Sequence, residues 1–139
     1  DEKAARNRPH KQLEVYRSAH LLGLQVHAMT LKLPKFELYE EGSQSRRSSK
    51  SVSSQIVEGH ALRQYKPEYL HYLARAYASA EETIEHLEYL LETGSAKAAA
   101  ADCESLIRNY DTLCRKLFNY QEAVQRGHDP RRTRLRSKS

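Results

Sequence analysis

Histidine and glutamate residues are the first candidates for chemistry, because helical proteins can bind pairs of metal ions between their helices. Such sites commonly use Glu-x-x-His, which places both side chains on one helix face, once on each of two helices. Glu68 and His71 have this spacing, but the sequence contains no second pair. His20 and His27 lie seven residues apart and align on one helix, without an adjacent carboxylate. We therefore predict no metal site and no cofactor.

Motifs of catalysis are equally scarce. The sequence contains no glycine-rich phosphate loop, no Gly-x-Ser-x-Gly elbow and no Cys-x-x-Cys pair. Its seven histidines and many serines could form a nucleophile and a base only through contacts between helices, which spacing alone does not define. We therefore predict that the protein is not an enzyme.

The cysteines and the hydropathy of the chain indicate its compartment. Cys103 and Cys114 are the only cysteines, and 11 residues of helix would separate them. That is about 16 Å, whereas a disulfide requires Cα atoms within about 7 Å, so we expect two buried free thiols in a reducing compartment. No apolar run approaches the roughly 18 residues of a membrane span, and no signal-peptide pattern is visible. We expect a cytoplasmic protein without a membrane partner.

Positive charge is concentrated at the carboxyl end of the sequence. Residues 126–139 contain six of the 23 Lys and Arg residues but only one of the 18 Asp and Glu residues, so the rest of the chain is electrically balanced. Clustered cations bind the phosphates of nucleic acid, although a charged tail can also be a disordered, solubilising segment. The candidate nucleic-acid-binding residues are Arg126, Arg131, Arg132, Arg134, Arg136 and Lys138.

Hydrophobic spacing predicts an all-α protein with four amphipathic helices. Their short connections favour an antiparallel, up-down-up-down four-helix bundle. We expect helices at about residues 12–33, 40–63, 66–92 and 96–126. The chain then divides into a loose arm over 1–11, the bundle over 12–126 and the basic tail over 127–139. In the connections, Phe36 and Tyr39 are expected to cover the end of the core, Gly94 to end the third helix and Ser95 to cap the fourth.

The first helix has two apolar rows. One row repeats at intervals of four and three residues and is expected to face the core: Val15, Ala19, Leu22, Val26, Met29 and Leu33. The other row lies about 100° further around the helix and consists of Leu21, Leu24, Ala28 and Leu31. This second row either widens the buried face of a compact bundle or contacts another subunit. The second interpretation makes these four residues a candidate oligomer interface.

The second helix has small residues where a core normally has large ones. Its inward positions are Ser45, Ser49, Val52, Ile56 and Gly59, so other helices must approach it closely. The few charged residues near this row, Arg46, Arg47 and Glu58, need partners. We favour a structural role for them, as pairs between helices or subunits, over contact with RNA.

The third and fourth helices have regular apolar rows. In the third the predicted row is Leu70, Leu73, Tyr77, Ala80, Ile84, Leu87 and Leu91, and in the fourth it is Cys103, Leu106, Tyr110, Leu113, Leu117, Tyr120 and Val124. Tyr65, Tyr69 and Tyr72 form an aromatic edge, expected at the core boundary, although tyrosines can also stack on bases. A further line of the third helix consists of Glu81, Glu85, Glu88 and Glu92, and we expect a solvated face that repels phosphate.

Three segments in order, HKQLEVYRSAHLLGLQVHAMTLKLP, SQSRRSSKSVSSQIVEG and YKPEYLHYLARAYASAEETIEHLEYLLETG, resemble the four-helix-bundle proteins of the rRNA intervening-sequence type. The resemblance covers about residues 12–124. Its most specific residues lie in the second helix and include Ser43, Gln44, Arg46, Arg47, Glu58 and Gly59. Members often have a proline after the Ser-Val step, where this chain has Ser53. The basic tail is not part of the pattern.

The resemblance implies a homopentameric ring of four-helix bundles. It also implies an architectural relation to the accessory proteins of diversity-generating retroelements, which bind a reverse transcriptase and nucleic acid. Our first hypothesis is a non-catalytic oligomeric scaffold that binds RNA, DNA or an RNA-handling protein, with the tail supplying the charge. The alternatives are a purely structural or protein-interaction module, and an accessory protein of a retroelement reverse transcriptase.

Overall fold

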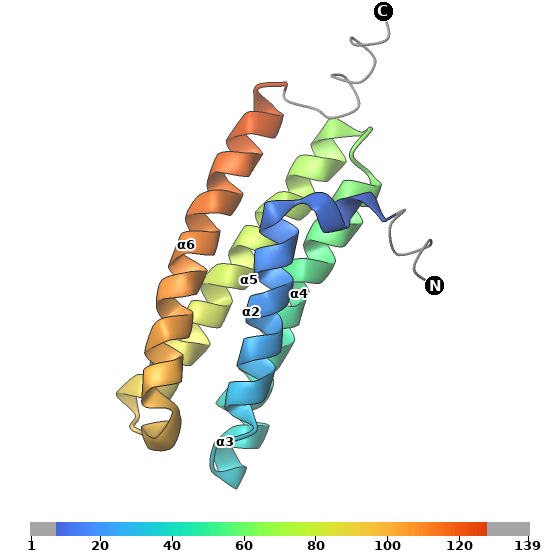
Figure 1. The fold of residues 1–139 in the computed structure, drawn as a ribbon. Helices are drawn as coiled ribbons and strands as arrows, with labels where there is room; N and C mark the ends of the chain where they lie inside the picture. The colour runs from blue at the N-terminus through green and yellow to red at the C-terminus, as the bar shows by residue number, and fades with distance from the viewer. Residues whose placement is uncertain (1–7, 128–139) are drawn as a thin grey trace, which may run out of the picture.

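Four long helices run back and forth along one direction in the computed structural model, which describes residues 8–127 (Figure 1). They are α2 (Glu14–Thr30), α4 (Glu41–Ala61), α5 (Lys66–Glu92) and α6 (Ala100–Gln125). Three short elements accompany them: η1 (Pro9–Gln12), α3 (Lys35–Tyr39) and η2 (Lys97–Ala99). Successive long helices point in opposite directions, so the predicted all-α, antiparallel four-helix fold is confirmed.

Each long helix packs against two others, and the sequence order fixes which two. Helix α2 packs against α4 and α6, and α5 packs against the same pair. Helices α2 and α5 therefore lie diagonally across the core, as do α4 and α6. The grooves between α2 and α4 and between α5 and α6 consequently lie on opposite sides of the bundle.

The small inward residues of α4 create the space that the rest of the core fills. Its predicted row is buried throughout, including Ser45, Ser49 and Gly59. The largest fully buried side chains, Tyr69 and Tyr110, come from α5 and α6. Burial raises the pKa of the Tyr110 hydroxyl, in keeping with its place in the core. Helix α4 is therefore a slim element around which bulkier helices close.

Two hydroxyls of α4 find partners on α5, whereas the buried Oγ of Ser45 has no hydrogen-bond partner among residues 8–127. The Oγ of Ser48 lies 2.8 Å from the Oγ1 of Thr83, and the Oγ of Ser51 lies 3.0 Å from that of Ser79. These bonds satisfy polar groups that would otherwise be costly to bury. The α4–α5 contact is thus specified by hydroxyl pairing as well as by shape.

The core rows predicted for the first and fourth helices are confirmed. All six residues of the α2 row are buried, and so are all members of the α6 row except Tyr120, which is half-buried. Cys103 and Cys114 are buried free thiols, as expected. Burial raises the pKa of Cys103 to about 11, so its thiolate, the reactive form, is scarce near neutrality.

The row predicted for the third helix is only half correct. Its fully buried residues are Tyr69, Leu73, Ala76, Ala80, Thr83, Leu87 and Leu90, whereas Leu70, Tyr77, Ile84 and Leu91 are partly buried. The buried face is rotated toward α4, where Thr83 pairs with the hydroxyl of Ser48. Tyr69 is consequently a core residue, and the prediction that it lies at the boundary is wrong.

The connections differ from the sequence expectation in two places. Residues 35–39 form the short helix α3, on which Phe36 and Tyr39 are more than 60% exposed, so they do not cover the core. Ser95 does not cap the fourth helix, because η2 intervenes and α6 begins only at Ala100. Gly94 does end α5, with the positive φ of 75° that favours glycine.

Neither the long nor the short helices within residues 8–127 combine the length and apolarity needed to cross a bilayer.

Two glycines of the bundle differ in the space around them, and this difference predicts opposite effects of substitution. A Cβ at Gly59 would lie 2.8 Å from the Cβ of Tyr72, and neither atom can rotate away. We expect Gly59→Ala to destabilise the protein by about 1–3 kcal/mol through overpacking. At Gly23 the nearest atom would be the carbonyl oxygen of Ser49 at 3.8 Å, an ordinary contact.

The matched control is therefore Gly23→Ala, which should be neutral or stabilising by up to about 1 kcal/mol because alanine favours helix. Urea unfolding of both variants measures the difference. Equal destabilisation by the two substitutions would contradict the close α4–α5 approach described above.

Candidate functional site

One end of the bundle combines cations from three distant parts of the chain. Segments 8–13, 60–66 and 125–127 lie together at the end where the described chain begins and stops (Figure 1). They contain five Lys and Arg residues and no Asp or Glu: Arg8, Lys11, Arg63, Lys66 and Arg126. We call this region the basic end. The tail residues Arg131, Arg132, Arg134, Arg136 and Lys138 lie outside the described residues.

The helix termini hold several of these cations in place. Arg63 donates to the carbonyl of His60 at 2.9 Å, and Lys66 donates to the carbonyl of Gln125 at 2.6 Å. Cations near the last carbonyls of a helix are favoured by its dipole. Arg17 donates to two carbonyls of the η1 region, which fixes η1 and exposes Arg8 and Lys11 beside it.

Two histidines lie in the positive field of the basic end. Burial lowers the pKa of His10, and Arg8 and Lys11 lower it further. Burial lowers the pKa of His60 to about 4, with additional contributions from Arg63 and His10. His60 is therefore neutral at physiological pH, and the charge of this end comes from Lys and Arg.

The two neighbouring arginines of α4 have different environments. Arg46 donates to the Oγ1 of Thr30 at 3.0 Å and to the carbonyl of Leu38 at 2.9 Å, and so joins α2, α3 and α4. Arg47 is exposed and makes no hydrogen bond or ion pair within residues 8–127. Glu58 is likewise exposed, two residues before the buried His60. The expected pairing inside the chain is therefore seen for Arg46 alone.

The remaining residues of this motif divide in the same way. Gly59 is buried against α5, Ser43 is half-buried and Gln44 is exposed. Ser43, Arg47 and Glu58 follow one outer line of α4 at helical spacing. The inner residues therefore shape the bundle, and the outer ones remain open to a partner.

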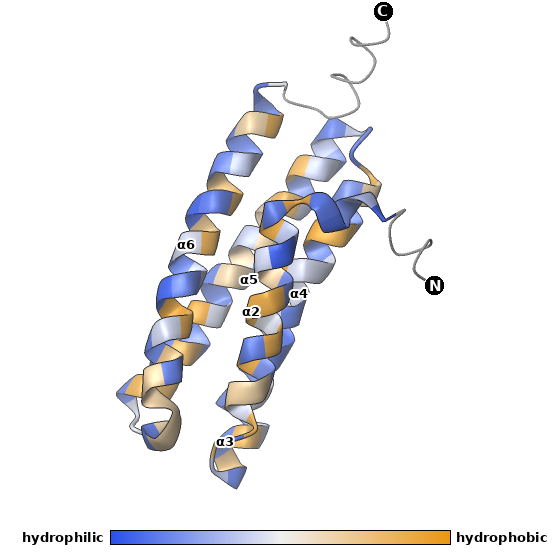
Figure 2. Cartoon of the chain, viewed as in Figure 1, coloured by the Kyte–Doolittle hydropathy of each residue, from blue (hydrophilic) through white to orange (hydrophobic). Residues whose placement is uncertain are grey.

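The second apolar row of α2 faces solvent. Leu21, Leu24 and Leu31 are 55–60% exposed, and Ala28 between them is also exposed. Figure 2 shows apolar residues along α2 where it lies in front of the other helices. The interpretation that this row widens the internal core is therefore wrong. Contact with another subunit stays a prediction.

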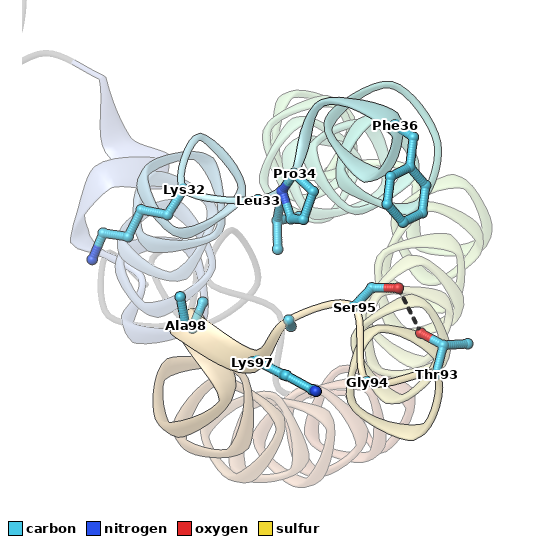
Figure 3. A pocket seen from close by; sticks show the side chains of 11 residues that line it. Lys32, Leu33, Pro34, Phe36, Thr93, Gly94, Ser95, Lys97 and Ala98 are labelled. Atoms are coloured by element: carbon cyan, nitrogen blue, oxygen red, sulfur yellow. Dashed lines mark hydrogen bonds between the residues drawn. The ribbon is translucent and has the colours of Figure 1, made fainter.

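A hollow of about 670 Å³ opens at the end opposite the basic end. Figure 3 shows it between the α2–α3 connection and the α5–α6 connection, with Lys32, Phe36 and Lys97 at its rim. Its hydroxyls are engaged with each other, since Thr93 donates to Ser95 at 3.1 Å. The lining holds no histidine or carboxylate that could act as a base. Among residues 8–127, no three His, Cys, Asp or Glu side chains gather to hold a metal ion.

Residues 11–119 match the model of the 23S rRNA-intervening sequence protein family. The chain belongs to this family. The match covers the bundle and the α4 motif, but it ends before Arg126 and the basic tail. Among proteins of curated function, none matches the chain. The family is not known as a family of enzymes, and the absence of activity stays a prediction.

Sequence reasoning had missed two features of this family member. The basic end could not be predicted from the sequence, because its cations belong to segments about 50 residues apart and only the fold brings them together. The second is a groove between α2 and α4, where the Nζ of Lys50 lies 3.2 Å from the Nδ1 of His27. The alignment of His20 and His27 on one helix was its only signal.

The adjacent arginines allow a sharp test of the α4 motif. Arg46→Ala removes two hydrogen bonds that join three helices, so we expect a loss of about 1–3 kcal/mol of unfolding free energy. Arg47→Ala removes a side chain with no such contacts and should change the stability of the single chain by less than about 0.5 kcal/mol. Chemical unfolding, followed by circular dichroism, measures both. A larger loss for Arg47→Ala than for Arg46→Ala would contradict these assignments.

The low pKa of His60 predicts a dependence of stability on pH. The unfolded chain binds a proton at this histidine near its ordinary pKa of about 6.5, whereas the folded chain does so only near 4. The stabilisation is complete above about pH 6.5 and is lost as the pH falls toward 4, by about 2–3 kcal/mol. His60→Gln should reduce this loss between pH 7 and pH 4.5. His71→Gln, at an exposed position, should retain it, and equal pH profiles for the two variants would contradict the prediction.

Proposed function

We propose that this protein is a non-catalytic, self-associating scaffold that binds RNA through its basic end and basic tail. The observation that carries the proposal is the convergence of charge. Five cations from three segments lie at the end of the bundle where the described residues stop, and one of them, Arg126, is paired with Glu122 at 3.8 Å. Together they offer a surface for phosphates that needs no reactive group and no base-specific pocket.

The rest of the bundle supports this location. The row of Glu81, Glu85, Glu88 and Glu92 on α5 is exposed, so phosphates are repelled from that side. Tyr65, which is 53% exposed, lies between Arg63 and Lys66 in the sequence and offers a ring on which an unpaired base can stack. This combination favours single-stranded RNA over a duplex.

Self-association supports the proposal because it multiplies weak contacts. The exposed row of α2 offers an apolar surface to a second copy, and the resemblance to the family implies a homopentamer. Several tails on one particle bind a long RNA with far higher avidity than one tail. We propose a cytoplasmic scaffold in which the bundles of several copies associate with one another and the basic end of each copy binds RNA.

RNA binding by the full chain and by a chain ending at Gly127 tests this function. The missing residues carry five cations, so the loss of affinity between 50 mM and 200 mM salt should be about 100-fold greater for the full chain than for the shortened chain. Fluorescence anisotropy with a labelled single-stranded RNA measures both salt slopes.

A full-length control separates charge from chain length. Changing the five tail cations to glutamine should reproduce the truncation, whereas Arg8→Gln with Lys11→Gln should lower affinity further in either background. Equal salt slopes for the full and shortened chains would overturn the role of the tail. No RNA binding at 50 mM salt would overturn the function and leave a protein-interaction module.

A further inference from the structure

The surface between α2 and α4 is basic around an apolar centre. A hollow of about 370 Å³ lies in this groove, lined by Gly23, Ser53 and four larger side chains: His20, Leu24, His27 and Lys50. The lining has no carboxylate, and the exposed Arg47 lies one helical turn from Lys50. Leu24 and Leu31 rise from the middle of this surface, which we call the α2/α4 face.

The surface between α5 and α6 has the opposite character. A hollow of about 300 Å³ there is lined by two carboxylates, one arginine and apolar or neutral groups: Glu81, Asp111, Arg115, Tyr77, Cys114, Phe118 and Asn119. Glu85, Glu88 and Glu92 continue the acidic row from Glu81 along α5 at helical spacing. Phe118 is 53% exposed beside them. We call this surface the α5/α6 face.

The carboxylates of this face act on the groups beneath them. Glu81 raises the pKa of the Tyr77 hydroxyl, and burial together with Glu81 and Asp111 raises the pKa of the Cys114 thiol. Both increases in pKa indicate a negative electrostatic field within the hollow. A cation presented by another molecule would relieve the mutual repulsion of these carboxylates.

We propose that copies of this chain associate head to tail, with the α2/α4 face of one copy resting on the α5/α6 face of the next. This inference rests on the self-association in the proposed function and names the surfaces that carry it. Leu24 and Leu31 of one copy pack against Phe118 and Tyr77 of its neighbour. Arg47 and Lys50 then oppose the glutamates of α5, so the apolar contact has a complementary charged rim.

Charge decides between this arrangement and a two-fold contact of α2 with α2. In a two-fold contact the same patch meets itself, so Arg47, Lys50 and the two histidines would face their own equivalents. The glutamates of α5 would also stay far from the contact, since the two faces lie on opposite sides of the bundle. A head-to-tail contact uses two different faces, so it repeats from copy to copy, and it closes into a ring where the rotation between successive copies allows it.

Charge reversal on each face tests the proposal. Arg47→Glu with Lys50→Glu makes the α2/α4 face acidic, and Glu85→Lys with Glu88→Lys makes the α5/α6 face basic. All four side chains are exposed, so folding should be retained, which circular dichroism verifies. Each double variant should shift from the oligomer mass of the unaltered chain toward 16.1 kDa in multi-angle light scattering. The chain carrying all four changes should regain the oligomer mass, because opposite charges face each other again.

A matched control reverses two exposed lysines at the far end of the bundle, Lys35→Glu with Lys97→Glu, and should keep the oligomer mass. An oligomer that resists both double reversals, or that the fourfold variant fails to restore, would overturn the head-to-tail contact and leave RNA binding intact. Restoration by the fourfold variant excludes the two-fold contact. A single-chain mass for the unaltered protein at every concentration would overturn self-association itself, and RNA binding would then be judged by the tail experiment alone.

Discussion

The whole bundle depends on packing around a helix that contributes almost no apolar volume. Helix α4 offers Ser45, Ser49 and Gly59 to the core, so hydrophobic burial of its own side chains is a small stabilising contribution. The missing volume is supplied by Tyr69 and Tyr110 from the facing helices. Their rings can reach the bundle axis only because small residues allow the backbones to approach. Two further hydroxyls of α4, those of Ser48 and Ser51, pair with hydroxyls on α5, which fixes the register of α4 against that helix.

This constraint explains where sequence reasoning succeeded and where it failed for the fold. Spacings of three and four residues were enough for the first, second and fourth helices, because in each the apolar or small positions form one row. Helix α5 has apolar residues on both edges of its buried face, so the pattern fits two rotations about 50° apart. The choice between them is made by α4, where the hydroxyl of Ser48 pairs with that of Thr83. The spacing of apolar residues along α5 contains no information about hydroxyl partners on another helix.

The candidate surfaces were less predictable than the fold, for a related reason. The exposed row of α2 could be read from the sequence, since both rows lie on one helix with known geometry. The bonds of Arg46 could not, because one of its acceptors is the backbone carbonyl of Leu38 in a helix that the pattern did not predict. The basic end depends on three chain segments that only the antiparallel topology brings together. Sequence spacing therefore identifies faces of single elements, whereas surfaces shared by several elements require the fold.

The small side chains of α4 and the exposure of the second apolar row of α2 are connected through the packing of these two helices. Gly23 faces α4, with room for a Cβ at 3.8 Å from the Ser49 carbonyl, and this direction fixes the rotation of α2. With the core row on one side and Gly23 at its edge, a period of 3.6 residues places Leu24 and Leu31 about opposite the core. No repacking of the single chain can bury them, because the same rotation would expose Val26 and Met29. The apolar surface of these leucines can therefore be removed from water only by contact with another molecule. The acidic, aromatic groove between α5 and α6 is the complementary surface that the chain itself provides.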